Sequence, residues 1–179
     1  MTQYLVEKHD VALFCPVGNV FSMDTVEFQK KNGEMVSVPM YPGTGGGDIY
    51  GESESLYHYD DFKADIMLQL ADVWMLSKIP QMAASGKIVW IAYVPVDYLD
   101  PIPKKILDTL RSAFKVVPWC DEAFNRLVAA GLRNVMSPIS LGLNTKLWVP
   151  LEEFPSDKGR PAEKRDFPET MKAMGYEED

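Results

Sequence analysis

The chain has little histidine, little cysteine and a shortage of basic residues. Its 179 residues include two histidines and two cysteines, and 18 Lys and Arg stand against 26 Asp and Glu, a formal net charge of −8. Nucleic-acid binding needs clustered Lys and Arg, so this balance argues against nucleic acid as a partner. His9 and His58 are isolated and do not have the spacing of a metal site.

Long apolar runs are also lacking. No run approaches the roughly 20 residues that a membrane span requires, and the first residues have no signal-peptide pattern. Cys15 and Cys120 lie in or beside apolar, strand-like runs, so two buried, reduced thiols are predicted in place of a disulfide. These features predict a cytoplasmic protein without a membrane-spanning segment.

The middle of the chain alternates between strand-like and helix-like segments. Uninterrupted apolar runs are typical of strands that are covered on both faces of a parallel sheet. The predicted strands are 64–70, 87–94, 115–119 and 134–139, and the predicted helices are 73–85, a helix from about Ile102 and a helix from Asp121 that turns Phe124, Leu127 and Val128 inward and ends at Gly131. This alternation predicts an α/β fold with a Rossmann-like, doubly wound and mostly parallel sheet.

The residues before this region predict an added β-hairpin. A strand is expected over 11–17, and two alternating runs, 25–30 and 35–39, flank an Asn-Gly turn signal. Residues 41–55 are predicted to form a Gly-rich loop. The charged tail is predicted to be a linker with a short helix over 162–174, so the chain divides into a domain over 1–150 and a linker or tail over 151–179.

Three polar or aromatic side chains follow the predicted parallel strands. In doubly wound sheets, ligands bind beyond the carboxyl ends of the strands, which is where Asp97 is expected. Its carboxylate would accept a hydrogen bond or a proton from a bound hydroxyl, or else bond to its own turn. Asp72 and Trp74 would hold a sugar between a carboxylate and an indole, or else Asp72 caps the next helix and Trp74 belongs to the core.

With these residues in view, the chain resembles the N-terminal, acceptor-side domain of retaining glycosyltransferases of the two-domain GT-B fold (group 1, family 4-like). The resemblance covers nearly the whole chain. Its motifs, in the family's order, are the strand ending in Asp72-Val-Trp74, the run Tyr93-Val-Pro-Val-Asp97, the strand and acidic turn over 116–122, the run over 130–135 followed by Leu141-Gly-Leu-Asn-Thr145, and a linker-like segment over 165–179.

The resemblance implies the acceptor-binding half of an enzyme that transfers a sugar from a nucleotide-sugar donor to a hydroxyl acceptor. It implies Asp97 as the catalytic residue and no tightly bound cofactor or metal. The substrate-binding residues that it implies are Asp72, Trp74, Tyr93, Tyr50 and Gly51. The family's first strand and its donor-binding domain have no counterpart in the sequence, so we expect the chain to be inactive as a transferase by itself.

Two alternatives remain open at this point. One is a non-enzymatic, truncated Rossmann-like module that oligomerises or recruits a partner; the other is a small nucleotide- or phosphosugar-binding enzyme that uses Asp97. The absence of a central first strand predicts that the slot beside 11–17 is filled by a changed strand order, by strand exchange in a homo-oligomer or by a companion chain. A monomer with the ordinary strand order and an empty slot would contradict that expectation.

Overall fold

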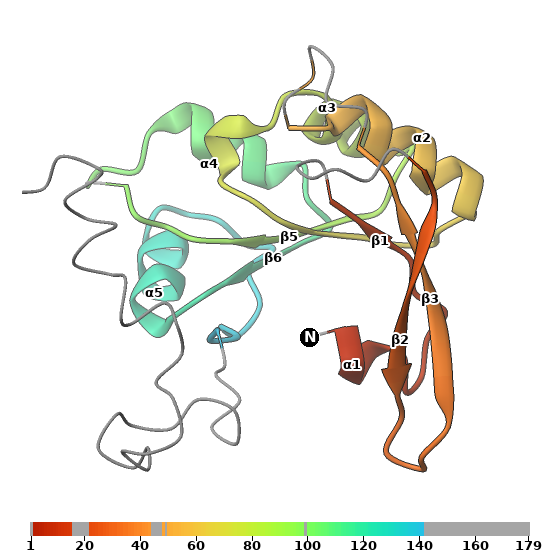
Figure 1. Cartoon of the computed structure of the whole chain (residues 1–179). Helices are drawn as coiled ribbons and strands as arrows, with labels where there is room; N and C mark the ends of the chain where they lie inside the picture. Colours follow the sequence, from red (N-terminus) through yellow and green to blue (C-terminus); the bar gives the residue numbers. More distant parts are fainter. Residues whose placement is uncertain (1, 16–21, 44–47, 49, 99, 142–179) are drawn as a thin grey trace, which may run out of the picture. The chain divides into compact units, whose positions relative to one another are not determined.

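A computed structural model describes residues 2–15, 22–43, 48, 50–98 and 100–141 (Figure 1). The chain divides into two compact units, Met1–Ser140 and Leu141–Asp179. The predicted boundary at residue 150 and the predicted helix over 162–174 lie outside the described residues. No helix in the described part of the chain is both long and apolar enough to cross a membrane.

The first sheet contains the predicted hairpin. Its strands are β1 (Leu13–Phe14), β2 (Asp24–Gln29) and β3 (Met35–Tyr41), in the order β1-β3-β2, and the short helix α1 (Thr2–Leu5) precedes them. Strands β2 and β3 are antiparallel, whereas β1 pairs with β3 in parallel. Gly33 closes the hairpin turn with a φ of 88°, a left-handed conformation that favours glycine. The hairpin prediction is confirmed, and of the strand expected over 11–17 the described residues form Leu13–Phe14.

The second sheet is all-parallel, with the order β4-β5-β6. Its elements in chain order are α2 (Glu52–Phe62), β4 (Met67–Leu70), the 3₁₀ turn η1 (Val73–Met75), α3 (Lys78–Ala84), β5 (Trp90–Val94), α4 (Lys104–Arg111), β6 (Lys115–Pro118) and α5 (Asp121–Ala129). A mixed α/β fold with a parallel sheet is therefore present, as the alternation of segments predicts.

The hydrophobic core lies between this sheet and its helices. Trp90, Ala92 and Val94 alternate along β5, so they point to one face of the sheet. There they belong to one buried cluster with Ile79 of α3 and Leu110 of α4. Figure 1 shows α3 and α4 over this face of the sheet. Continuous apolar character thus identifies the parallel strands, and alternate residues build the core.

Several local predictions are wrong. The helix expected over 73–85 is broken into η1 and α3, because Leu76 is extended between them, with φ −97° and ψ 133°. Instead of a strand over 134–139, the described residues form one isolated bridge between Val135 and Val116. Val128, which was expected to face inward, is exposed, and the buried residues of α5 are Ala123 and Leu127. The helix does end as expected, with Gly131 at φ 83°.

Two further corrections concern the loop over 41–55 and the cysteines. Helix α2 begins at Glu52, inside the segment predicted to be a loop, after Gly51 in the left-handed conformation at φ 63°. The sequence of α2 has no clear apolar stripe that would predict a helix, and the one residue of α2 that is buried is the charged Glu52. Cys15 and Cys120 form no disulfide, but both are exposed, so the prediction of buried thiols is wrong.

Candidate functional site

The candidate site lies beyond the carboxyl ends of β4 and β5. Leu70, the last residue of β4, pairs with Tyr93, the penultimate residue of β5. The two strands therefore end side by side, and the segments that follow them carry Asp72 and Asp97. This is the edge of a parallel sheet at which ligands bind in doubly wound folds. The placement agrees with the position that the sequence predicts for both carboxylates.

The Tyr98 phenol feels the charges of both carboxylates. Burial raises the pKa of its phenol, and the negative charge of Asp97 and, to a lesser extent, that of Asp72 raise this pKa further. A hydrogen bond between the Tyr98 hydroxyl and the backbone of Trp74 lowers the pKa. The charges of both carboxylates and the backbone of Trp74 therefore act on the same phenol. Sequence reasoning missed Tyr98, although it directly follows Asp97.

Trp74 presents an open aromatic surface beside these carboxylates. Its side chain is 58% exposed, which excludes the alternative that it belongs to the core. The Tyr50 ring stands edge-on to the indole at 86°, with the ring centroids 6.0 Å apart. This edge-to-face contact is a favourable aromatic arrangement. The structure thus brings Tyr50 and Trp74 together, as the predicted site requires.

Asp72 occupies the position before the 3₁₀ turn η1 but does not cap it with its side chain. Its backbone carbonyl accepts the Met75 N–H at 3.1 Å, so the turn is closed by the backbone. The alternative of a side-chain cap is therefore wrong. The Asp72 carboxylate remains available to other donors.

Gly51 acts on the site through the backbone. Its N–H donates to the Asp48 carbonyl at 2.8 Å, and its left-handed conformation starts α2. This hydrogen bond and this backbone conformation together fix the direction in which the chain leaves Tyr50. A positive φ favours glycine here, because a side chain would add strain. Gly51 therefore belongs to the turn that positions Tyr50.

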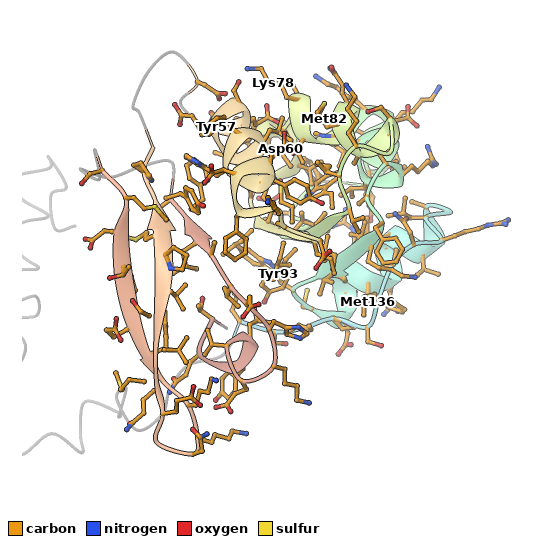
Figure 2. All side chains as sticks on the ribbon, turned by 90° about the vertical axis from the view of Figure 1, so that its right-hand side faces the viewer. Tyr57, Asp60, Lys78, Met82, Tyr93 and Met136 are labelled. Carbon is orange, nitrogen blue, oxygen red and sulfur yellow. The ribbon has the colours of Figure 1, made fainter. Side chains whose placement is uncertain are left out.

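Tyr93 lies deeper than the other predicted site residues. Its side chain, labelled in Figure 2, is buried on β5. Its hydroxyl donates to the Ile139 carbonyl at 2.8 Å. Its ring also contacts the Trp119 ring, with the centroids 5.9 Å apart. The hydroxyl is thus already bonded within the fold. A substrate contact of Tyr93 stays a prediction.

Arg126 of α5 holds the loop that carries Asp97. Its Nε and Nη2 donate to Asp100 Oδ1 at 3.1 and 2.8 Å, and its Nη1 donates to the Val96 carbonyl at 3.3 Å. A further bond joins Nη2 to the Tyr98 carbonyl. The planar guanidinium suits this set of converging acceptors. Sequence reasoning missed Arg126, because the contact joins α5 to a loop 26 to 30 residues away.

The chemistry of this group suits a polar ligand with hydroxyls and an apolar face. The exposed Asp97 carboxylate and the Asp72 carboxylate accept hydrogen bonds, while the indole of Trp74 packs against C–H groups. Within the described ranges, no three His, Cys, Asp or Glu side chains are grouped so as to hold a metal ion.

Comparison with known proteins adds no identification. No family model matches the sequence, and neither a curated protein nor a solved structure is significantly similar to the chain.

Proposed function

We propose that the group of Tyr50, Asp72, Trp74, Asp97 and Tyr98 binds the hydroxyl acceptor of a glycosyl transfer. The observation that carries this proposal is that β4 and β5 end side by side, so the segments that follow them bring Asp72, the exposed Trp74 and Asp97 to one edge of the sheet. Carboxylates accept hydrogen bonds from sugar hydroxyls, and an indole covers the C–H face of a sugar ring. A nonpolar ligand would leave the two carboxylates without donors.

In this proposal the chain is the acceptor-binding half of a retaining GT-B glycosyltransferase with a Rossmann-like fold. Asp97 follows a parallel strand at the cleft-forming edge of such a fold, where it accepts a hydrogen bond or a proton from the acceptor hydroxyl. The nucleotide-sugar donor is a co-substrate held by the second domain of these enzymes. Residues 1–179 by themselves are therefore expected to bind acceptor without transferring sugar.

Sugar binding tests this function. Chain labelled with ¹⁵N at tryptophan is titrated with a panel of mono- and disaccharides, and the Trp74 indole signal is followed by NMR. A saturable shift is expected for at least one sugar, with affinity reduced about tenfold or more, about 1.4 kcal/mol, in Trp74→Ala and in Asp97→Asn. Asp65→Asn, at the other end of β4, is the matched control. A folded chain that binds none of the panel, or whose binding both variants leave unchanged, contradicts the proposal.

A second candidate function is a non-enzymatic binding or assembly module. The observation that favours it is the apolar edge strand β4, on which Leu68 and Leu70 are exposed. Such a module would not need a ligand at the candidate site around Asp97. It predicts association through β4 that Asp97→Asn does not affect, whereas the first function predicts sugar binding that Asp97→Asn weakens.

A further inference from the structure

The segments that carry the candidate site contain acidic and aromatic residues but no basic one. Their sequences include four aspartates and three aromatic residues, and not one Lys, Arg or His. These segments are the turn into α2 over 48–51, the stretch after β4 over 71–77 and the stretch after β5 over 95–103. The charge of the site is therefore negative unless side chains from elsewhere in the fold compensate it.

Two of the four aspartates are paired with cations from outside these segments. Lys78 Nζ lies 3.4 Å from Asp48 Oδ2. Arg126 Nη2 lies 2.8 Å from Asp100 Oδ1, and the same guanidinium donates to two backbone carbonyls of the loop after β5. Both cations are thus bound to carboxylates of their own, and they do not compensate the charges of the other two aspartates.

Asp72 and Asp97 are the two aspartates that remain without a cation. Neither takes part in an ion pair within the described part of the chain. Leu70 of β4 pairs with Tyr93 of β5, so the segments that carry the two carboxylates start side by side. Burial raises the pKa of Tyr98 most, and the negative charges of Asp97 and Asp72 raise it further. Two uncompensated carboxylates thus act on one phenol at this edge of the sheet.

An exposed aromatic surface lies in the same segment as Asp72. The Trp74 side chain is 58% exposed, and the Tyr50 ring stands edge-on to it, with the ring centroids 6.0 Å apart. The face of an aromatic ring is negative, so it attracts a cation, and an indole does so more strongly than a phenol or a phenyl ring. A phosphate or carboxylate group on the ligand would be repelled by the carboxylates and by the ring face alike. Both kinds of side chain therefore favour a positively charged ligand.

We propose that the acceptor bound at this site is an amino sugar, a hydroxyl compound that carries a protonated amine. An ammonium group has three N–H donors and no acceptor, so it suits carboxylates that lack a cation, as Asp72 and Asp97 do. The C–H groups of the sugar beside the ammonium would pack on the Trp74 indole. The formal net charge of −8 attracts cations over longer distances. This inference rests on the proposed function, because it specifies the ligand of the same site.

The probes are glucosamine, galactosamine and mannosamine, each compared with its neutral parent sugar and with its N-acetyl derivative, which has no charge. The Trp74 indole signal of the ¹⁵N-labelled chain is followed by NMR at about pH 6, where the amine is protonated. We expect at least one amino sugar to bind about five- to tenfold more tightly than its parent and its N-acetyl form, because an ion pair and a cation–π contact are both added. This preference should shrink when the ionic strength rises from about 0.05 M to about 0.5 M.

Two variants test whether the carboxylates provide this preference. Asp97→Asn and Asp72→Asn should each reduce it by about threefold or more, because each removes one negative charge and keeps the shape of the side chain. Asp65→Asn removes an exposed charge at the other end of β4 and is the matched control, which should keep the full preference.

The outcomes separate this inference from the function on which it rests. If the neutral parent sugars bind as tightly as the amino sugars, or if both variants keep the preference seen in Asp65→Asn, the inference is overturned and the proposed function stands. If no sugar of either kind binds the folded chain, the proposed function fails, and this inference fails with it.

Discussion

The Glu52 carboxylate binds the backbone N–H of Ser77, 25 residues away, with Oε1 and Oε2 at 2.8 and 3.0 Å. It also accepts the Ser77 hydroxyl at 2.8 Å and the N–H groups of Lys78 and Ile79 at 2.9 and 3.1 Å. The first N–H groups of a helix have no partner within the helix, so this carboxylate caps α3 from α2. Glu52 is 4% exposed, so the carboxylate that links the two helices is itself buried.

The first prediction is that Glu52→Gln destabilises the chain by about 1.5–3 kcal/mol, because hydrogen bonds to a charged acceptor contribute about that much. Glutamine has nearly the same shape but replaces one acceptor oxygen with an NH₂ donor that faces the N–H groups of α3. The free energy of unfolding in urea measures the effect. Glu122→Gln, exposed in the first turn of α5, is the control and should change it by less than about 0.5 kcal/mol. Equal stability of the two variants would contradict the capping role.

The second prediction concerns Asp48, whose pKa is lowered to about 2, chiefly by the hydrogen bond from the Ser53 N–H. Lys78 Nζ, 3.4 Å away, contributes to the same shift. Because the folded pKa lies below the unfolded value of about 3.9, the carboxylate stabilises the fold above pH 4, and this stabilisation is lost as pH falls towards 2.

The stability difference between wild type and Asp48→Asn should therefore be largest above about pH 5 and shrink towards pH 2. At neutral pH we expect Asp48→Asn to lower the free energy of unfolding by about 0.5–1 kcal/mol, as the removal of a helix-capping side chain does. Chemical denaturation across this pH range is the measurement, with Asp108→Asn as the matched control. A difference that stays constant with pH would show that Asp48 has an ordinary pKa.

The particular elements show what the sequence can and cannot predict. The strand β5 and the hairpin follow from local patterns, a continuous apolar run and an Asn-Gly turn, so they are predictable. Helix α2 has no local apolar pattern, and the buried Glu52 that fixes its start depends on a contact with Ser77. Short-range periodicity does not contain that information.

The same distinction holds for the candidate site. Asp72 and Asp97 were predictable, because the ends of parallel strands determine where they lie. The exposure of Trp74 and the contact of Arg126 with the Asp97 loop depend on tertiary packing. Sequence reasoning therefore finds the edge of the sheet where the candidate site is proposed, and the structure adds the residues that lie around it.

The third prediction is that Arg126→Gln loosens the loop from Val96 to Asp100. The variant loses the charged donors to Asp100 and to the loop carbonyls, and we expect a stability loss of about 1–2 kcal/mol. Amide hydrogen exchange of Asp97 and Tyr98 should become faster than in wild type. Arg126→Lys should behave almost like Arg126→Gln, because an ammonium cannot reproduce the planar fork. Arg133→Gln, on the exposed surface, is the control. If amide exchange of Asp97 and Tyr98 were the same in Arg126→Gln as in Arg133→Gln, Arg126 would not hold this loop.

The fourth prediction tests the geometry of the site without a ligand. Since the negative charges of Asp97 and Asp72 raise the pKa of Tyr98, Asp97→Asn should lower this pKa towards its ordinary value, and Asp72→Asn should lower it by less. NMR titration of ¹³C-labelled tyrosine rings gives the value directly. Asp65→Asn, at the opposite end of β4, should leave it unchanged.

The same phenol has a consequence for stability. Its folded pKa lies above the unfolded value of about 10, so the fold favours the protonated form, and the stability that this provides is lost as pH rises through the folded pKa. Asp97→Asn should therefore lose less stability than wild type between pH 9 and about pH 12. If the titration of Tyr98 and the alkaline stability were both insensitive to Asp97 and Asp72, the three side chains would not form one site, and the proposed acceptor site would lose its physical basis.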